Sequence, residues 1–370
     1  MVLRHGDAVM TPIRILVDSF ADSGLLNAQM GNAREIVSRL DPGRFHVSMF
    51  SLGEPDPRIV RRRNTRLVQL PERRQTVRIL AEFLLGTHAL LFYMKASPAS
   101  RWYSGLRRKW RDQRTTIAAI ESQADLKNEP TITRESIRVW EQTVLRCDYL
   151  FSNSSSVQRS LEREHGLSSE IIPTGVDTRF FTPDWDRPQN ERPRVLFAGA
   201  LRPFKQPQFL LTAAAHFPDA EFRIAGRGPE AAELKERVAR EGRRNVALLG
   251  SLAAEKLREE YQRADVFLFP SAWEGSPKVI LEAAACGIPV IARNNYSPET
   301  VVHEVTGFQA GSDEELLVSL KVLLNNPGLR RKMGHSGRLH SRRYDWDVIT
   351  AQWEEAFERV AGKQETRKVS

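Results

Sequence analysis

Short runs rich in β-branched and aromatic residues alternate with helical patterns through the second half of the chain, at intervals of about 25 residues. These runs cover 194–200, 221–226, 245–250, 266–270 and 289–293. The first half alternates less regularly, with a helix expected near 27–40 and strands expected at 13–18, 46–52, 66–70, 89–94, 115–120, 149–153 and 170–173. Alternation of this kind is typical of βαβ units, in which helices cover both faces of a parallel sheet. The chain is therefore predicted to be an α/β protein.

The length of 370 residues fits two such domains better than one. Residues 181–193 contain three prolines and few aliphatic side chains, which predicts a linker. We therefore expect a first domain at 1–183 and a second at 190–343. An amphipathic helix at 344–362 is expected to pack back on the first domain. Two doubly wound domains usually bind their ligand in the cleft between them.

Composition excludes several classes of protein. The chain is 41% apolar and 27% charged, which is globular rather than disordered, and its two cysteines, Cys147 and Cys286, are expected to be buried thiols. We find neither a secretory signal nor an apolar run long enough to cross a membrane. These features predict a cytoplasmic protein. A net charge of +9 indicates an acidic partner of some kind.

The segment 269–290 is the most specific in the chain. We expect Ser276 to cap a helix whose first turn opens at Pro277, which leaves free backbone N–H groups facing the loop after a strand. Glu274 stands just outside this helix end, and Glu282 lies between one and two turns inside it. Both carboxylates can then face one polyhydroxyl ligand, to which they offer hydrogen-bond acceptors.

Two glutamates at this spacing, across a strand, a loop and a helix that end in Gly-x-Pro-Val, resemble the Glu-x7-Glu signature of the GT-B retaining glycosyltransferases of family 4. Three other segments agree with that family in order and spacing, and they cover 151–181, 197–205 and 224–229. The first reads Ile-Pro-Thr-Gly-Val-Asp, with Thr174 where the family usually has Asn. In the second, Ala200 stands at the usual Arg position, so Arg202 is expected to supply that charge.

The resemblance implies a GT-B fold, in which two Rossmann-like domains with doubly wound parallel sheets face a central cleft. It implies a retaining transfer of sugar from a UDP- or GDP-linked donor to a glycan or lipid-linked acceptor. Lys205 and Arg202 would hold the diphosphate, Glu274 the sugar hydroxyls and Glu282 the ribose. The other donor-binding residues that it implies are Gly199, Gly226, Arg227, Gly228, Gly275, Ser276 and Pro277. The two cations and the helix end are suited to the leaving diphosphate without a metal, so we expect neither a metal nor a cofactor.

The first domain matches the family less well. Gly24 stands in the loop after the first strand, where the family has a glycine-rich turn. At the end of the fourth strand, where a family histidine often falls, Lys95 or Ser97 is the candidate, and Glu121 ends the next strand. Lys95, Glu121 and Gly24 are the residues expected to line the acceptor side. His88 lies too early in its strand and is expected to be structural or exposed.

Two basic clusters lie in the first domain. Residues 58–78 hold eight arginines against one glutamate, and residues 101–114 hold six cations with Trp102, Tyr103 and Trp110 among them. Cations interleaved with aromatic side chains suit an anionic membrane surface, which would place the protein on the inner face of the membrane. A solvated helix whose aromatic side chains face the core fits equally well. No recognised nucleic-acid module accompanies the charge, so nucleic acid is not an expected partner.

Two other functions stay open at this point. A catalytically silent GT-B subunit that binds a nucleotide sugar would explain Ala200 and the missing histidine. A nucleotide-sugar 2-epimerase would share the fold but needs acid and base groups that we cannot assign. A nicotinamide dehydrogenase is disfavoured, because Gly226-x-Gly228-x-x-Ala231 is not followed by the acidic residue that such a fingerprint requires.

Overall fold

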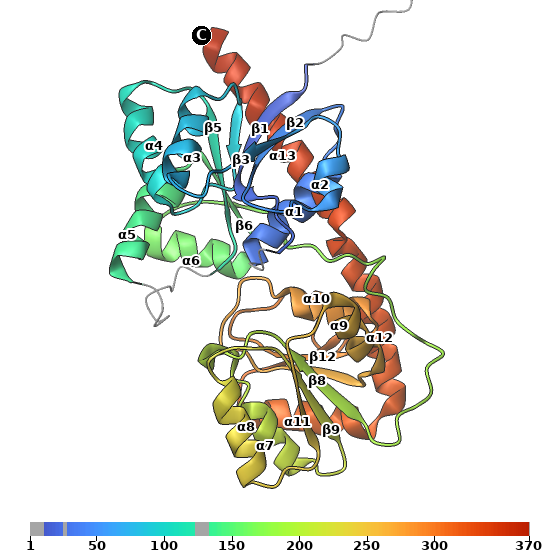
Figure 1. The fold of residues 1–370 in the computed structure, drawn as a ribbon. Helices are drawn as coiled ribbons and strands as arrows, with labels where there is room; N and C mark the ends of the chain where they lie inside the picture. The colour runs from blue at the N-terminus through green and yellow to red at the C-terminus, as the bar shows by residue number, and fades with distance from the viewer. Residues whose placement is uncertain (1–10, 25–27, 123–132, 370) are drawn as a thin grey trace, which may run out of the picture. The chain divides into compact units, whose positions relative to one another are not determined.

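A computed structural model gives the fold of residues 11–24, 28–122 and 133–369 (Figure 1). The chain divides into two compact units. The first unit contains residues up to 153, residues 158–172 and residues from 349 onward, and the second contains 154–157 and 173–348. Each unit is built on one parallel sheet, as the alternating pattern predicts.

The sheet of the first unit has seven strands in the order β3-β2-β1-β4-β5-β6-β7. All neighbouring pairs are parallel. The strands are β1 (Ile13–Phe20), β2 (Phe45–Ser51), β3 (Thr65–Gln69), β4 (Leu90–Phe92), β5 (Thr115–Ile120), β6 (Tyr149–Ser152) and β7 (Glu170–Ile171). The helices that follow them are α1 (Ala28–Arg39), α2 (Pro57–Arg61), α3 (Gln75–Leu85), α4 (Pro98–Lys109), α5 (Arg134–Thr143) and α6 (Ser155–His165). Chain order reverses between β1 and β4, which makes this the switch point of the sheet.

The sheet of the second unit has six strands in the order β10-β9-β8-β11-β12-β13, again all parallel. Its strands are β8 (Arg194–Ala198), β9 (Glu221–Ala225), β10 (Val246–Gly250), β11 (Val266–Phe269), β12 (Val290–Arg293) and β13 (Gly307–Ala310). Its helices are η3 (Pro203–Lys205), α7 (Phe209–His216), α8 (Ala231–Arg240), α9 (Ala254–Arg263), α10 (Lys278–Ala285), α11 (Asp313–Asn325) and α12 (Pro327–Ser341). The switch point here lies between β8 and β11. Strand β13 was not expected from the sequence.

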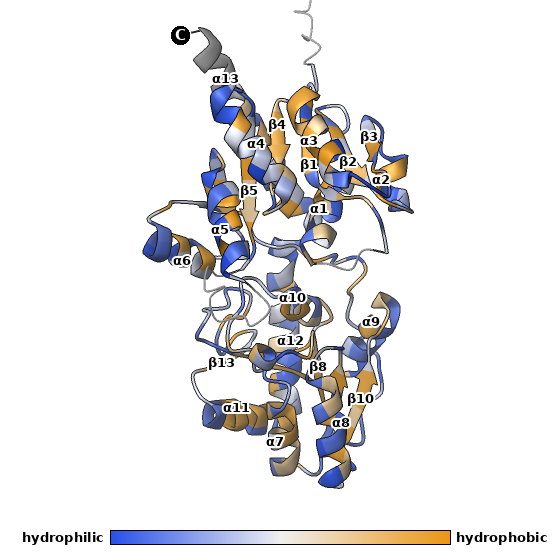
Figure 2. Ribbon diagram, turned by 60° about the vertical axis from the view of Figure 1, so that its left-hand side comes forward, coloured by the Kyte–Doolittle hydropathy of each residue, from blue (hydrophilic) through white to orange (hydrophobic). Residues whose placement is uncertain are grey.

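The core of each unit follows from strands that are apolar on both faces. Strand β11, Val-Phe-Leu-Phe, is fully buried, and the inner strand β1 buries Ile15, Leu16 and Val17. In Figure 2 strands such as β4 and β10 are coloured as hydrophobic, whereas helices such as α6 and α8 mix hydrophilic and hydrophobic residues. Such strands need helices on both sides, because an apolar face left in water costs about 25 cal/mol for each Å².

The predicted linker is not a free connection in the structure. The division between the units falls at 172/173, before the proline-rich stretch. Phe181 is buried in the core of the second unit, and the Arg187 guanidinium pairs with Asp265 at 2.8 Å. Trp185 stacks on His335 with 3.9 Å between ring centroids. An aromatic side chain and an arginine therefore attach this stretch to the second unit, although its proline content suggested a spacer.

The last helix, α13 (Trp346–Val369), begins in the second unit, and its residues from 349 onward belong to the first. Trp353 packs on Phe92 and Phe151 of the first sheet, with ring centroids 4.8 and 5.0 Å apart. Phe357 packs on Phe92 at 4.8 Å. Glu354 adds an ion pair with Arg44 at 2.7 Å, beside the aromatic contacts. Among the residues described, we find no helix long and apolar enough to span a bilayer.

Substituting Trp353 tests how much the first unit depends on this helix. Trp353→Ala is expected to lower the free energy of unfolding by about 3 to 5 kcal/mol, because it removes a fully packed aromatic side chain. Val348→Ala, at a position on the same helix that is 43% exposed, should change it by no more than about 0.5 kcal/mol. Urea unfolding followed by circular dichroism measures both, and equal effects would contradict the packing role of Trp353.

Candidate active site

The predicted donor residues of the second unit lie in loops at the carboxyl ends of β8, β9 and β11. Strand β8 leads into Gly199, β9 into Gly226, and β11 into the segment 270–277. These strands are adjacent in the sheet and parallel, so their carboxyl ends share one edge. This edge contains the switch point, where open α/β sheets bind their ligands.

Lys205 and Glu274 come together at this edge. The Lys205 ammonium forms an ion pair with Glu274 Oε1, and their side chains are only 15% and 12% exposed. The Ser271 hydroxyl donates a hydrogen bond to the same carboxylate oxygen at 2.7 Å. Lys205 also lies over the ring of Phe269, with 5.0 Å from its Nζ atom to the ring centroid. The sequence analysis proposed both charges but did not identify Ser271, which orients the carboxylate.

Two aromatic rings flank this pair. Phe204, immediately before Lys205, stacks on Trp273, immediately before Glu274, with ring centroids 4.2 Å apart and 20° between planes. Backbone bonds reinforce the contact, since the Ala272 N–H donates to the Phe204 carbonyl at 2.7 Å. The stack joins the loop after β8 to the loop after β11 and so holds the two charged residues together.

The predicted glycines bring the loops after β8 and β9 into direct contact. A Cβ on Gly226 would lie 1.8 Å from the Gly199 carbonyl oxygen, and one on Gly228 would lie 2.3 Å from that of Leu201. Both glycines have φ near +150°, where other residues are strained. The Leu201 N–H donates to the Arg227 carbonyl at 2.9 Å, which ties the loops further. These glycines therefore have a packing role in addition to the donor-binding role that the resemblance implies.

The predicted cap of α10 is wrong. The helix begins at Lys278 with Pro277 at the N-cap, and no side chain caps it. Ser276 lies one residue too early, because the extended conformation of Pro277 separates it from the first turn. Gly275 and Ser276 nevertheless lie in the loop after β11, as expected. Arg202 precedes η3 as its N-cap and is exposed, as is Arg227 in the loop after β9.

Glu282 is held from the neighbouring helix α9. The buried hydroxyl of Tyr261 donates to Glu282 Oε2 at 3.1 Å. Burial raises the pKa of Glu282, while Lys278 and the Tyr261 hydrogen bond oppose that shift. The sequence analysis did not identify Tyr261. Tyr296, after β12, was also missed, and its buried hydroxyl has no hydrogen-bond partner in the described part of the chain.

The first unit has its own polar edge at the switch point between β1 and β4. Asp18, near the end of β1, accepts a bond from the Lys95 backbone N–H at 2.9 Å and one from the Ser100 hydroxyl at 3.3 Å. The Lys95 ammonium reaches Ser19 Oγ at 3.3 Å. Burial raises the pKa of Asp18 and lowers that of Lys95, and each partly offsets the shift of the other. Asp18 was not identified from the sequence.

Glu121 follows β5, the strand next to β4 in the sheet. Its Oε1 accepts bonds from the Tyr93 hydroxyl and from Asn32 Nδ2, the latter at 2.8 Å. Asn32 is 4% exposed, and its Oδ1 atom has no hydrogen-bond partner within the described ranges. Tyr93 has φ of +65°, which is unusual for a residue with a side chain and is found most often at functional sites. The edge thus presents an acidic group, a lysine and an unsatisfied amide oxygen.

The structure also locates Gly24 and His88, two further residues of the first unit that the sequence analysis discussed. Gly24 is exposed, and a Cβ there would meet nothing within 4 Å, so no contact in the structure requires glycine. His88 is buried at the start of β4, with its Nε2 atom 3.0 Å from Glu82, so the structural role is confirmed. Burial and nearby arginines lower the pKa of His88 to about 4. Both Cys147 and Cys286 are free thiols, and Cys286 is buried.

Comparison with known proteins places these observations in a family. Residues 183–340 match the family described as glycosyl transferases group 1. The resemblance to glycosyltransferases inferred from the motifs is confirmed at this level.

The two-sheet architecture is also shared. Sucrose-phosphate synthase from Thermosynechococcus elongatus superposes with a TM-score of 0.79, at 20% identity, over 95% of this chain and 100% of the other. The Anabaena protein HepE, solved in complex with UDP and glucose, has a TM-score of 0.74 at 16% identity, over 94% of this chain and 100% of the other. The predicted GT-B class, with two Rossmann-like parallel-sheet domains, is confirmed.

Curated relatives are similar over part of their length. A D-inositol 3-phosphate glycosyltransferase from Xylanimonas cellulosilytica is 28% identical in an alignment of 253 residues that covers 61% of this chain and 60% of that protein. A GDP-mannose-dependent monoacylated alpha-(1-6)-phosphatidylinositol monomannoside mannosyltransferase from Corynebacterium glutamicum is 32% identical in an alignment of 204 residues that covers 49% of this chain and 53% of that protein. The chain thus spans between half and two thirds of these relatives.

Replacing Tyr261 tests how Glu282 is held. Folding raises the pKa of Glu282. Its protonated carboxyl group therefore stabilises the folded protein at acid pH, and this stabilisation is lost as the pH rises through the folded-state pKa. The Tyr261 hydroxyl limits that loss by stabilising the carboxylate. Tyr261→Phe should therefore destabilise the protein by about 1 to 3 kcal/mol at pH 7.5, and by less at pH 5.

Chemical unfolding at the two pH values measures this difference. Thr143→Val is the matched control, since the buried Thr143 hydroxyl donates its hydrogen bond to a backbone carbonyl, that of Val139, at 2.7 Å. Its effect should not depend on pH in this range. A Tyr261→Phe effect of equal size at both pH values would show that the hydroxyl does not interact with a titrating carboxylate.

Proposed function

We propose that this chain is a glycosyltransferase that moves a sugar from a nucleotide-sugar donor to a glycan or lipid-linked acceptor, with retention at the anomeric carbon. The observation that carries the proposal is the Lys205–Glu274 ion pair with Ser271, at the switch point of the second sheet, in the part of the chain that matches group 1 glycosyltransferases. The Corynebacterium relative is named as GDP-mannose-dependent, and the Anabaena structure contains UDP and glucose. These names support a nucleotide-sugar donor linked to GDP or UDP.

The reaction requires cationic side chains beside the leaving diphosphate, which becomes more negative as the bond breaks. The bond between the anomeric carbon and the diphosphate oxygen breaks, and its electron pair leaves with the nucleoside diphosphate. The acceptor oxygen bonds to the same face of the sugar, and its proton passes to the leaving phosphate or to water. Lys205 and the exposed Arg202 would stabilise the charge that develops on the diphosphate. No metal is then required.

The second glutamate and its neighbours would bind the rest of the donor. A donor whose diphosphate contacts Lys205 brings its sugar hydroxyls within reach of Glu274, because the two side chains are adjacent. Glu282, fixed by Tyr261, would accept hydrogen bonds from the ribose. The acceptor would bind at the polar edge of the first unit, where Asp18, Lys95 and Glu121 offer both signs of charge.

Release of nucleotide from a panel of UDP- and GDP-sugars tests this function. Glu274→Gln is expected to reduce turnover by about 100-fold or more, because it removes the negative charge of the carboxylate. Ser271→Ala is expected to reduce turnover by about tenfold, because it removes only the hydrogen bond that orients this carboxylate. Glu314→Gln, an exposed glutamate on α11, is the matched control and should retain full turnover.

The other functions give different results in the same assay. A silent subunit would show a donor-dependent rise in melting temperature but no nucleotide release with any acceptor. A 2-epimerase would change the sugar without an acceptor, which analysis of the products detects. Turnover by Glu274→Gln at the wild-type rate would contradict the assignment of the site.

Treatment with EDTA tests the role assigned to the cations. If Lys205 and Arg202 neutralise the diphosphate, turnover after removal of divalent ions should stay within about twofold of the untreated rate. Lys205→Gln should then lose turnover that added Mg²⁺ does not restore. Loss of activity in EDTA that Mg²⁺ or Mn²⁺ reverses would show that a metal ion also neutralises the diphosphate.

A further inference from the structure

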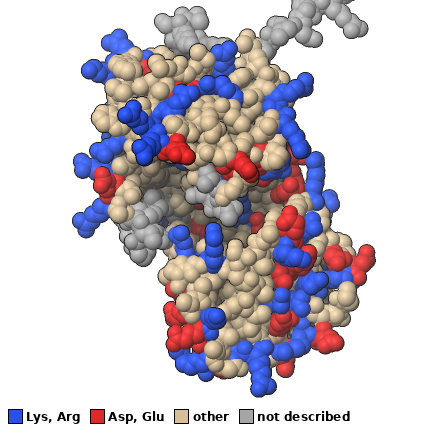
Figure 3. Space-filling model, viewed as in Figure 1, with Lys and Arg blue, Asp and Glu red and all other residues tan. Residues whose placement is uncertain are grey.

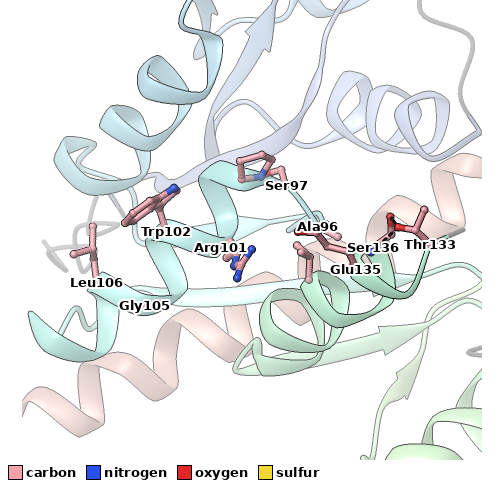
Figure 4. Close-up of a pocket in the computed structure, with 11 residues that line it drawn as sticks. Ala96, Ser97, Arg101, Trp102, Gly105, Leu106, Thr133, Glu135 and Ser136 are labelled. Atoms are coloured by element: carbon pink, nitrogen blue, oxygen red, sulfur yellow. Dashed lines mark hydrogen bonds between the residues drawn. The ribbon is translucent and has the colours of Figure 1, made fainter.

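A pocket of about 800 Å³ lies in the first unit between α4 and α5 (Figure 4). Its walls are mostly apolar and include Pro98, Trp102 and Leu106 of α4 and Val139 of α5. The lining residues on the α4 side run from Ala96, before the helix, to Leu106 (Figure 4). A volume of this size accommodates a small organic ligand or an alkyl chain.

Both helices are fixed where the pocket begins. The Ser97 hydroxyl accepts a bond from the Ser100 N–H, and the Thr133 hydroxyl accepts one from the Ser136 N–H, each at 3.1 Å. Gly105 lies in the wall of the pocket at its middle, and a Cβ at this position would meet nothing within 4 Å. The pocket therefore has free space beside Gly105, which a larger side chain could fill.

The structure separates the six cations of 101–114 into two groups. Arg107 pairs with Asp148 at 2.6 Å and Arg114 pairs with Asp112, so these two are part of the fold. The others have no ion-pair partner within the described ranges, and all are exposed; they are Arg101, Arg108, Lys109 and Arg111. Trp102 and Trp110 are 64% and 59% exposed, while Tyr103 is buried. Basic side chains border the part of the first unit that carries α4 (Figure 3).

The other basic cluster, 58–78, is more strongly tied to the fold. Arg58 pairs with Asp56 and Glu35, each at 2.8 Å, and Arg66 pairs with Glu82. Arg62 is buried and donates to the Leu40 and Phe45 carbonyls, at 3.1 and 2.9 Å. This cluster contains no tryptophan. The surface around α4 is therefore the stronger candidate for binding a lipid.

The pocket also adjoins the polar edge described above. Ala96, at its start, follows Lys95, and Ser100 on the first turn of α4 donates to Asp18. An alkyl chain in the pocket would thus place a head group at the edge where Asp18 and Lys95 lie. The unpaired cations near the end of α4 would at the same time face the phosphates of an anionic bilayer.

We propose that the pocket between α4 and α5 binds the alkyl chain of a lipid-linked acceptor, drawn from an anionic membrane that the end of α4 contacts. The proposal rests on the proposed function only for the chemistry at the head group. Binding of the alkyl chain involves only residues of the first unit. It can therefore be tested without a glycosyl transfer assay.

Calorimetry tests whether the protein binds the alkyl chain of a lipid. Octanoyl and decanoyl lysophosphatidylglycerol are titrated, as monomers, into the full-length protein. Each added methylene should strengthen binding by up to about fourfold, and glycerophosphoglycerol, which lacks the chain, should bind about tenfold more weakly or worse. Gly105→Trp, which fills the pocket, should weaken binding of the decanoyl lipid by about tenfold or more. Gly105→Ala is the matched control and should bind nearly as wild type does.

Flotation with phosphatidylglycerol vesicles tests the cations separately. The double variant Arg108→Gln, Lys109→Gln should lose salt-sensitive vesicle binding yet keep its affinity for the monomeric lipid. Equal affinity for glycerophosphoglycerol and the lipids, or decanoyl lipid binding by Gly105→Trp equal to wild type, would overturn the proposal. Binding of a lipid-free oligosaccharide that Gly105→Trp blocks would identify the pocket as a glycan site and overturn it too.

Failure of this proposal is distinguishable from failure of the proposed function. Gly105→Trp should keep the rise in melting temperature that a nucleotide sugar produces, because the donor residues lie in the other unit. That rise also shows that the variant is folded. If the donor binds and turns over while lipid affinity is independent of chain length, only the chain-binding proposal fails.

Discussion

The loops after β8 and β9 can touch only because the β9 loop has glycines where it meets the backbone of the β8 loop. The position of a Gly226 Cβ, 1.8 Å from the Gly199 carbonyl oxygen, leaves no room for any other residue. This contact fixes the turn after β8, from which η3 and Lys205 follow. The Phe204–Trp273 stack then links η3 to the loop after β11, where Glu274 lies. The ion pair at the centre of the candidate site therefore depends on backbone packing two loops away.

The two polar edges pair their charges in different ways. In the second unit, a lysine and a carboxylate meet directly, with a serine and aromatic rings around them. In the first unit, Lys95 binds Asp18 through its backbone N–H, and its ammonium reaches Ser19 instead. The charge on Lys95 is thus less completely neutralised by a direct contact. Both edges contain a lysine, but the donor site in the second unit was identified from its resemblance to a family and not from its charges.

The sequence was sufficient to place every strand except β13, because buried parallel strands are continuous apolar runs and their spacing reveals the crossovers. It also identified Glu274 and Lys205, since their neighbours follow a recognisable pattern. Ser271, Tyr261 and Asp18 were missed because their roles depend on contacts between residues far apart in the chain. The Ser276 cap failed for a local reason, the extended backbone at Pro277. The high density of positive charge in 58–78 was evident from the sequence, but the burial of Arg62 could be seen only in the structure.

The crossing of α13 from one unit to the other has a consequence for biosynthesis. Phe92 and Phe151 belong to strands that leave the ribosome early, yet the aromatic residues that cover them, Trp353 and Phe357, are translated long afterwards. The first unit therefore cannot complete its core while the second is being made, and an apolar sheet face stays exposed during that interval. The second unit, continuous from 173 to 348, can finish folding first. The second unit can therefore be complete before the first, although most of the first unit is made earlier.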